Sequence, residues 1–219
     1  MTNNIIHIFY FKQTEQLSAA DFNFFLKQLP EIFQNDIKAF KHRQSAEASL
    51  LGKIILQYAF QRLDLRYSLF DIQIGHKDRP IINNEIDFNI SHSGDFVGCA
   101  ITQSAKVGFD IEKHRKIELN LFRKYFDEKE WSEIQSATNK ENSFFDLWTL
   151  KESAIKCDGR GVEVLSKTHK QFADNNIICD TTVFYYRQLL IEDNYSCAVC
   201  SNKLFSLNTR QLSLKDLHI

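Results

Sequence analysis

Hydrophobic and polar positions along the chain follow two periods, and these periods predict its helices and strands. The apolar run at residues 5–11 predicts a buried strand, and Ser18 is a suitable N-cap for a helix that Pro30 interrupts. A longer helix is predicted over residues 44–63, with a buried stripe that includes Leu50, Leu51 and Tyr58. Strands are then predicted near residues 69–74, 87–91, 96–102 and 106–112.

The second half of the chain is predicted to hold helices first and strands afterwards. The predicted helices lie near residues 118–125, 128–137 and 141–157, and the predicted strands near 162–166, 176–188 and 194–201. Asp127, with Glu130 three residues later, resembles a capping box that starts the middle helix. Gly159 suits a left-handed cap at the end of the last helix. No linker rich in Gly or Ser separates the two halves.

Composition narrows the class of protein. At 219 residues the chain is long enough for a large core, as one large domain or two small lobes. Its 27 Lys and Arg residues against 28 Asp and Glu residues give a net charge of -1. General nucleic-acid binding is therefore not expected, because it depends on a basic excess. The apolar start is too short to span a bilayer, so we expect a cytoplasmic protein without a membrane segment.

Two of the five cysteines, Cys197 and Cys200, have the spacing of half a zinc site or of a redox pair. Their segment has the composition of a strand, and residues three apart on a strand point to opposite faces. We therefore interpret both as packing residues. The odd number of cysteines, without a disulfide-like framework, suits a reducing compartment.

Two carboxylates are predicted to share one face of a strand. Apolar and acidic residues alternate over residues 107–112, which directs Asp110 and Glu112 to one side and Phe109 and Ile111 to the other. Adjacent like charges repel, and a hard cation such as Mg²⁺ commonly balances them. A solvated strand face is the competing interpretation.

The helix predicted at residues 141–157 offers a second acidic position. Trp148, Glu152 and Lys156 are spaced four apart and form one stripe, which combines an apolar plate, a third possible metal ligand and a cation for phosphate oxygens. Lys151 is open to two interpretations, a surface ion pair or a contact with substrate.

A third segment, at residues 88–94, reads Phe-Asn-Ile-Ser-His-Ser-Gly and precedes the other two. In this order the chain resembles a 4′-phosphopantetheinyl transferase of the Sfp type. That family is marked by F-N-x-S-H-S, G-x-D-x-E and W-x-x-K-E-x-x-x-K, which match residues 88–93, 108–112 and 148–156. The likeness extends more loosely over residues 40–165, including the Leu-Leu-Gly segment at residues 50–52 and the turn at residues 158–161.

The resemblance implies an α+β fold of two similar lobes related by a pseudo-twofold axis, with the coenzyme between them. We place an N-terminal lobe at residues 1–104 and a C-terminal lobe at 105–219, the latter carrying the carboxylates and the catalytic helix. A faint similarity between residues 95–101 and 194–199 fits such a repeat.

The implied reaction transfers the 4′-phosphopantetheine arm of coenzyme A to a serine of an acyl or peptidyl carrier protein, releasing adenosine 3′,5′-bisphosphate. Asp110, Glu112 and Glu152 are the expected Mg²⁺ ligands. Lys156 is expected to bind a pyrophosphate oxygen and to stabilise the leaving group. Glu152, acting directly or through a metal-bound water, is the favoured general base, and Glu130 is the alternative.

The same resemblance suggests which residues bind coenzyme A. His92 is expected to hold the 3′-phosphate, with Ser91 as a secondary contact. Residues 78–80, Asp-Arg-Pro, replace the Gly-Lys-Pro common in the family, so Arg79 is the candidate phosphate cation there. Ala48 stands where an arginine is common, and that phosphate contact would pass to a basic residue at positions 41–43, of which Arg43 is our candidate.

Two other functions fit parts of the pattern. A metal-dependent phosphodiesterase or nuclease would use the same carboxylates to activate water, and a non-catalytic relative would bind a carrier protein only. The expected enzyme is a monomer. Aromatic residues 122, 125 and 126, with basic residues 123 and 124, form either a carrier-docking patch or part of the core.

Overall fold

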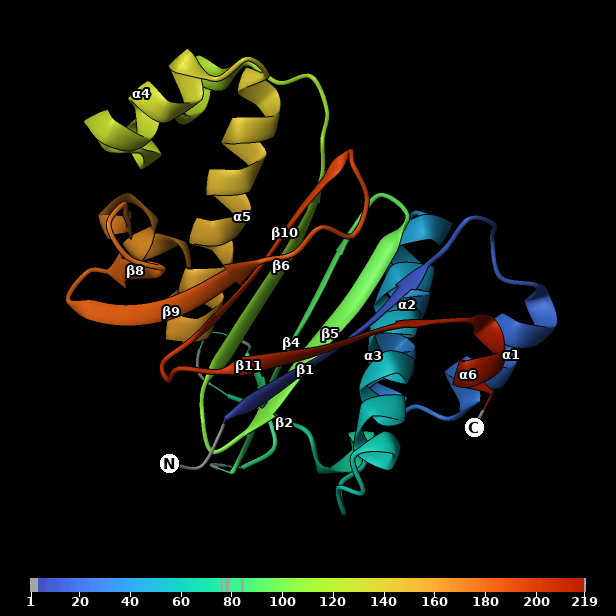
Figure 1. Cartoon of the computed structure of the whole chain (residues 1–219). Helices are drawn as coiled ribbons and strands as arrows, with labels where there is room; N and C mark the ends of the chain where they lie inside the picture. Colours follow the sequence, from blue (N-terminus) through green and yellow to red (C-terminus); the bar gives the residue numbers. More distant parts are fainter. Residues whose placement is uncertain (1–3, 76, 78, 84, 219) are drawn as a thin grey trace.

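The computed structural model describes residues 4–75, 77, 79–83 and 85–218. Its strands form two main sheets, each covered by a long helix (Figure 1). Asp78, part of the Asp-Arg-Pro departure, lies outside the described residues. No helix in the described ranges is both long and apolar enough to cross a membrane.

The first sheet has the strand order β11-β1-β5-β4. Its strands are β1 (Ile5–Lys12), β4 (Ile86–Ser93), β5 (Phe96–Gln103) and β11 (Ser206–Leu212). The helices beside it are α1 (Ala19–Lys27), α2 (Glu31–Ala39), α3 (Arg43–Arg62) and α6 (Leu214–Leu217). The buried stripe of α3 packs on this sheet and forms the largest part of its core.

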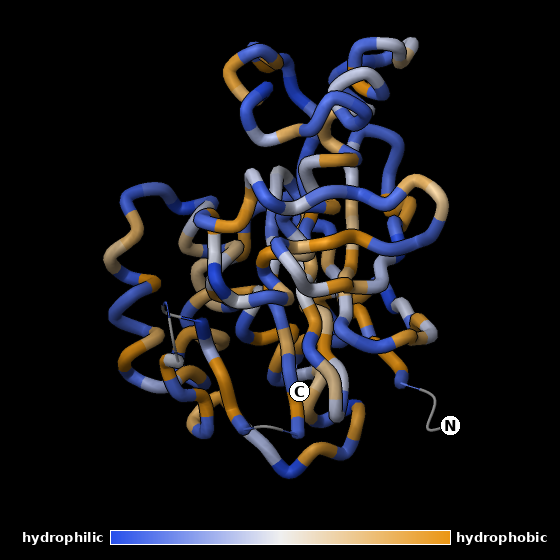
Figure 2. Tube along the Cα trace, turned by 90° about the vertical axis from the view of Figure 1, so that its left-hand side faces the viewer, coloured by the Kyte–Doolittle hydropathy of each residue, from blue (hydrophilic) through white to orange (hydrophobic). Residues whose placement is uncertain are grey.

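The second sheet has the order β6-β10-β9-β8-β7. Its strands are β6 (Val107–Lys113), β7 (Thr168–Gln171), β8 (Asn176–Cys179), β9 (Thr182–Gln188) and β10 (Tyr195–Ser201). Helix α5 (Lys140–Asp158) lies along β6 and β10, and α4 (Glu128–Ser136) packs on α5. In Figure 2 the hydrophobic stretches lie mainly in the central strands, while the peripheral loops are largely hydrophilic.

The two halves of the chain repeat one topology. Strand, long helix and hairpin follow one another as β1, α3, β4, β5 and again as β6, α5, β9, β10. Both sheets place the second hairpin strand in the middle, in the orders β1-β5-β4 and β6-β10-β9. The similar segments noted in the sequence belong to these central strands, β5 and β10. The α+β fold with two lobes is thereby confirmed.

The lobe boundary at residues 104 and 105 stays a prediction. Strand β11 comes from the second half of the chain, yet it pairs in parallel with β1, from Ile5 opposite Ser206 to Phe11 opposite Leu212. The last strand therefore completes the sheet that the first strand begins.

Side chains of β4 join the two sheets at the free edge of β6. The backbone N–H groups of alternate β6 residues donate to side-chain oxygens of alternate β4 residues instead of to a neighbouring strand. The pairs are Val107 to Asp87 at 2.8 Å, Phe109 to Asn89 at 2.9 Å, Ile111 to Ser91 at 3.3 Å and Lys113 to Ser93 at 3.0 Å. This satisfies donors that an unpaired edge leaves open. We call this contact the β4–β6 junction.

Gly108 allows α5 to lie directly on β6. A Cβ atom at this position would stand 2.0 Å from the carbonyl oxygen of Ser153 and 2.3 Å from the amide nitrogen of Cys157. No side chain fits at such distances, so the glycine of the G-x-D-x-E motif fixes the close approach of helix and strand. Gly52 has a similar role in the first lobe, where a Cβ would stand 2.7 Å from Ile90 Cγ2.

Several predicted elements need correction. Residues 69–74 are not one strand: Ser68 and Asp71 form a capping box that starts a 3-10 helix, Leu69–Asp71, and only β2 (Gln73–Ile74) follows, paired with β3 (Pro80–Ile81). Residues 162–166 lie in a 3-10 helix, Gly161–Lys167, rather than a strand. Residues 176–188 form the β8–β9 hairpin, with Asp180 at φ 60° in its turn. Strand β11 and helix α6 were not predicted.

The cysteine prediction is confirmed. All five cysteines are free and buried. Cys197 packs in the core between the two sheets, and Cys200 packs on the opposite face, under α5. The capping box formed by Asp127 and Glu130 at the start of α4, and the left-handed Gly159 after α5, are also present.

Candidate active site

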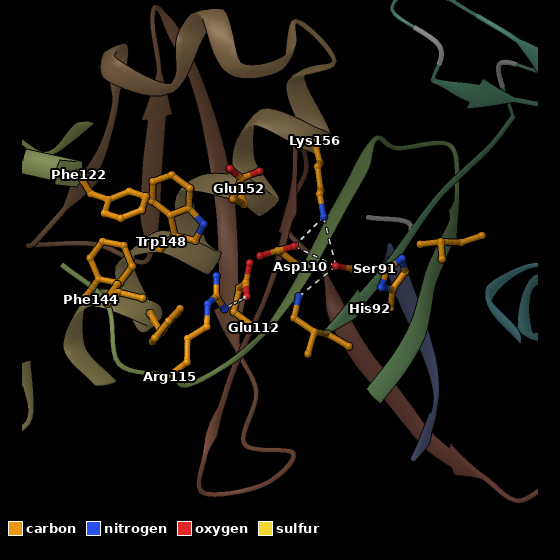
Figure 3. A pocket seen from close by; sticks show the side chains of 14 residues that line it. Ser91, His92, Asp110, Glu112, Arg115, Phe122, Phe144, Trp148, Glu152 and Lys156 are labelled. Atoms are coloured by element: carbon orange, nitrogen blue, oxygen red, sulfur yellow. Dashed lines mark hydrogen bonds and ion pairs between the residues drawn. The ribbon is translucent and has the colours of Figure 1, made fainter. Parts of the chain in front are cut away.

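A cavity of about 430 Å³ opens where β4, β6 and α5 meet (Figure 3). Both lobes contribute to its lining. It is lined by Ile90, Ser91 and His92 of β4, by Asp110, Ile111 and Glu112 of β6, by Arg115, Ile117 and Phe122, and by Phe144, Phe145, Trp148, Glu152 and Lys156 of α5. The three sequence motifs therefore meet at one place.

The predicted side-chain directions are confirmed for both acidic segments. Strand β6 directs Asp110 and Glu112 into the cavity, while Phe109 packs in the core between the sheets. On α5 the whole stripe of Trp148, Glu152 and Lys156 lines the cavity, because Gly108 brings this face of the helix onto the strand.

Lys156 and Ser91 tie the buried Asp110 into a polar network. Lys156 Nζ lies 2.6 Å from Asp110 Oδ1 and also donates to Ser91 Oγ at 3.2 Å and to the Phe109 carbonyl at 3.3 Å. Ser91 Oγ donates to the same Asp110 oxygen at 2.9 Å and accepts the Ile111 N–H. Ser91 thus contacts catalytic candidates of both β6 and α5, in addition to its place in the β4–β6 junction.

The cavity holds more negative charge than its neighbouring cations balance. Burial, followed by repulsion from Asp110 and Glu112, raises the pKa of Glu152 to about 7, although Lys156 opposes the shift. Burial is also the main reason that the pKa of Asp110 is raised. Asp110 Oδ2 is buried and has no hydrogen-bond partner among the described residues. A cation bound at this oxygen would give Oδ2 a partner and would lower the raised pKa values of Asp110 and Glu152.

The three carboxylates do not form a tight cluster by themselves. In the described part of the chain, the one group of three acidic or metal-ligating side chains whose ligand atoms lie within 4.8 Å of one another is Asp127, Glu130 and His169. Asp110, Glu112 and Glu152 share the cavity at wider spacing. Glu112 is held by Arg115, at 2.9 Å between Nη1 and Oε2, and by Ser93 Oγ at 3.2 Å.

The tight group at Asp127 and Glu130 has a structural explanation. Glu130 is fully buried and accepts hydrogen bonds from the backbone N–H groups of Asp127 and Lys170. Its charge is balanced by Lys151 Nζ at 2.8 Å, and Lys151 is also buried. Neither Glu130 nor Lys151 lines the cavity. Both interpretations of Lys151 given above are therefore wrong, because it forms a buried ion pair rather than a surface pair or a substrate contact.

His92 lies at the exposed border of the cavity, opposite the side of β4 that faces β6. Partial burial lowers its pKa, and the charges of Lys156 and Lys53 lower the pKa further. The imidazole therefore stands in a positive environment, which suits an anionic ligand.

Lys53 is a candidate cation for binding an anionic ligand beside His92, and the sequence motifs did not single it out. It follows Gly52, which packs against Ile90 of β4, and its ammonium donates to Ser49 Oγ at 2.9 Å. Among the described residues no carboxylate lies within ion-pair distance of Lys53, and burial lowers its pKa. The helical spacing offered a signal, since Lys53 interrupts the apolar run after the Leu-Leu-Gly segment.

Arg79 and Arg43 are not brought to the cavity. Arg79 Nη2 contacts both carboxylate oxygens of Asp87, at 2.9 and 2.7 Å, and the Val107 carbonyl at 3.0 Å. Arg43 forms an ion pair with Glu47 and stacks over the ring of Phe22 at 3.8 Å. Their assignment to coenzyme A remains a prediction from the resemblance, without a supporting position among the described lining residues.

Aromatic side chains form one wall of the cavity. Trp148 packs edge to face with Phe122 at 5.3 Å and stacked with Phe144 at 5.7 Å between ring centroids (Figure 3). Phe126 is buried beneath them, so it belongs to the core. The cavity thus combines an acidic floor with an apolar side.

Comparison with known proteins gives matches on both halves of the chain. A family model described as "4′-phosphopantetheinyl transferase, N-terminal" matches residues 16–104, and one described as "4′-phosphopantetheinyl transferase superfamily" matches residues 106–211. The second match contains Asp110, Glu112, Glu152 and Lys156.

Individual relatives agree. The 4′-phosphopantetheinyl transferase gsp of Aneurinibacillus migulanus is 30% identical over 224 residues, covering 98% of this chain and 92% of that protein. The 4′-phosphopantetheinyl transferase Sfp of Bacillus subtilis (strain 168) is 29% identical over 185 residues, 75% of this chain and 78% of that protein. The similarity spans nearly the full length and includes the residues of the cavity, and the chain therefore belongs to the 4′-phosphopantetheinyl transferase family, of the Sfp type.

Proposed function

We propose that this transferase moves the 4′-phosphopantetheine arm of coenzyme A onto a serine hydroxyl of an acyl or peptidyl carrier protein in a Mg²⁺-dependent reaction. Asp110, Glu112 and Glu152 bind the metal, and adenosine 3′,5′-bisphosphate is the second product. The observation that carries the proposal is the buried, unpartnered Oδ2 of Asp110 in a cavity shared with two further carboxylates and Lys156.

The donor set fits a hard divalent cation. All three side chains offer carboxylate oxygens, which Mg²⁺ prefers, and their wide spacing leaves room for water and phosphate oxygens in its shell. When bound, Mg²⁺ would neutralise charge on the pyrophosphate oxygens. A bound cation would also lower the pKa of Glu152 from its value of about 7 and so favour the carboxylate form.

Lys156 is the residue that meets the leaving group. Its side chain is 29% exposed and reaches the cavity from the helix face that carries Glu152. In the reaction the serine oxygen forms a bond to the β-phosphorus, and the bond to the oxygen of adenosine 3′,5′-bisphosphate breaks. Lys156 donates to that oxygen and stabilises the negative charge it gains.

Glu152 is the general base that we favour. Its carboxylate lines the cavity one helical turn from Lys156, so it is placed to accept the serine proton as the hydroxyl attacks. The alternative base, Glu130, is fully buried. It caps the start of α4 and forms an ion pair with Lys151. We therefore assign Glu130 a structural role.

The 3′-phosphate of coenzyme A binds between His92 and Lys53. These two side chains come from β4 and α3, and their charges act on each other. Lys53 takes the place of the cation that Ala48 removes from the family pattern. The pantetheine arm then lies along the wall formed by Trp148, Phe122 and Phe144, which offers apolar surface.

The enzyme is proposed to act as a cytoplasmic monomer. One chain supplies all the residues assigned above, and the five free, buried thiols suit a reducing compartment. Nucleic acid and membrane are not among its proposed partners.

One incubation tests the proposal. Purified protein, MgCl₂, coenzyme A and an apo carrier protein are combined, and the carrier is measured by intact mass. Attachment of the arm, lost on chelation of the metal and restored by Mg²⁺, is the expected result. Cleavage of coenzyme A without attachment would point to a hydrolase, and binding without either product would point to a scaffold. Each of these two results would overturn the proposal.

A further inference from the structure

Within the described residues, one edge of β6 pairs with no neighbouring strand. On this edge, side chains of β4 accept hydrogen bonds from the backbone N–H groups, and basic side chains donate to the backbone carbonyls. The Phe109 carbonyl accepts from Lys156, and the Val107 carbonyl, one rung along the same edge, accepts from Arg79. Arg79 therefore occupies the position next to the catalytic lysine, but it faces the end of the strand rather than the cavity.

Arg79 also holds the last turn of α5. One of its guanidinium nitrogens, Nη1, donates to the carbonyl oxygen of Lys156, while Nη2 contacts the Val107 carbonyl and Asp87. Asp87 in turn accepts the Val107 N–H at 2.8 Å. Both peptide groups that meet at this corner, one on β6 and one on α5, are thus bound to a single pair of side chains.

The pair is well placed to act as a unit. Arg79 and Asp87 are 19% and 18% exposed, so solvent screens their attraction only in part. A planar guanidinium can donate in several fixed directions at once, which a lysine ammonium on a flexible stem does less well. With its donors bound to Asp87 and to two carbonyls, the guanidinium is committed to protein contacts.

We propose that Arg79 and Asp87 form a positioning pair, which fixes Lys156 of α5 over Asp110 of β6 without touching coenzyme A. The inference rests on the proposed function for its kinetic readout. It replaces the expectation that Arg79 is a phosphate ligand, and it gives the arginine that stands in place of the family's common lysine a structural role in this chain.

The test compares Arg79→Ala, Asp87→Ala, their double variant, Lys156→Ala and the Arg79→Ala/Lys156→Ala double variant in the transfer assay. Each single change at the pair should lower kcat about tenfold, the effect of about 1.4 kcal/mol, with KM for coenzyme A changed less than about twofold. The double variant should be no slower than either single one. Arg79→Ala should have no further effect on kcat when Lys156 is already alanine, since the pair acts through that residue.

A second substrate separates positioning from phosphate binding. The ratio of KM for 3′-dephospho-coenzyme A to KM for coenzyme A should equal the wild-type ratio in both single variants. A large rise of KM with Arg79→Ala alone, together with loss of that ratio, would show that Arg79 binds coenzyme and would overturn the inference. Wild-type kcat in both variants would overturn it as well.

Conservative variants guard against simple misfolding. Asp87→Asn keeps an oxygen for the Val107 N–H but removes the negative charge. Arg79→Lys keeps the positive charge but loses the planar guanidinium. Both variants should fold and show part of the kcat loss. Arg210→Ala on β11, which removes an ion pair with Asp216 of α6, is the matched control and should keep wild-type kcat. If the wild type transfers no arm, the proposed function fails, while non-additive thermal unfolding of the Arg79 and Asp87 variants still tests the pair.

Discussion

Asp110 is the side chain on which the contacts of the cavity converge. Its Oδ1 binds Lys156 and Ser91, and its Oδ2 is left for a ligand. Asp110→Asn keeps the size of the side chain but replaces one carboxylate oxygen with an NH₂ group, which cannot bind a cation. We expect transfer to fall about a thousandfold or more, equivalent to about 4 kcal/mol. Near-normal turnover in excess Mg²⁺, measured by intact mass, would refute the ligand assignment.

Glu152 makes stability depend on pH in the metal-free protein. Its pKa is about 7 in the folded state and 4.5 in the reference state, so folding takes up a proton between these values. Stability therefore falls as pH rises from about 4.5 to 7. Metal-free Glu152→Gln should melt a few degrees above the wild type at pH 8, with little difference at pH 4.

Added Mg²⁺ gives the complementary result for Glu152. It should raise the melting temperature of the wild type at pH 8 and have a much smaller effect on the glutamine variant, because a ligand is missing. An equal Mg²⁺ shift in both proteins, read in the same thermal scans, would remove Glu152 from the metal site.

His92 and Lys53 should affect the coenzyme rather than the chemical step. His92→Ala and Lys53→Ala are each expected to raise KM for coenzyme A about tenfold or more, the loss of one charge-assisted contact, with kcat little changed. Neither should alter KM for 3′-dephospho-coenzyme A. Lys38→Ala, at the exposed end of α2, is a control of the same charge. Equal effects on both substrates would contradict the assignment.

At the scale of elements, the contact of α5 with β6 sets the geometry of the site. Gly108→Ala would place a methyl group against the backbone of Ser153 and Cys157, so the helix must move away and take Glu152 and Lys156 with it. We expect a loss of stability of about 1–3 kcal/mol or more and loss of most transfer. Circular dichroism melting and the mass assay measure the two effects.

Gly159→Ala is the matched control for Gly108. It has φ 87° and nothing within 4 Å of the point where an alanine methyl group would lie, so the substitution strains only the local backbone, by about 1 kcal/mol. This variant should unfold at a slightly lower temperature and keep its transfer rate. Comparable loss of activity in both glycine variants would show that the close approach at Gly108 is not what positions the catalytic side chains.

At the scale of the whole molecule, the β4–β6 junction joins the lobes through side chains rather than through a shared sheet. Asn89→Ala would leave the Phe109 N–H without its acceptor next to the catalytic strand. An unsatisfied buried donor costs about 1–3 kcal/mol. We expect a lower urea midpoint with one cooperative transition. Two separate transitions by fluorescence and circular dichroism would indicate that the lobes unfold independently.

Much of the site could be predicted from the sequence, but fewer of the contacts that hold its residues in place. Periodicity placed Asp110, Glu112, Glu152 and Lys156 on the correct faces, because strand and helix spacing act locally. It could not show that Lys151 and Glu130 form a buried pair or that Arg79 turns to Asp87, since these contacts depend on how distant segments pack. Strand β11 was not predicted because its side chains are mostly exposed and polar, so the segment has no clear hydrophobic pattern.

The parallel pairing of β11 with β1 has a consequence for biosynthesis. Strand β1 leaves the ribosome well before β11, so the partner that covers its outer edge is made only when residues 206–212 emerge. Until then that edge remains exposed and open to pairing with other chains. We therefore expect nascent or prematurely terminated products to need chaperones or to aggregate, even where the catalytic motifs have already been translated.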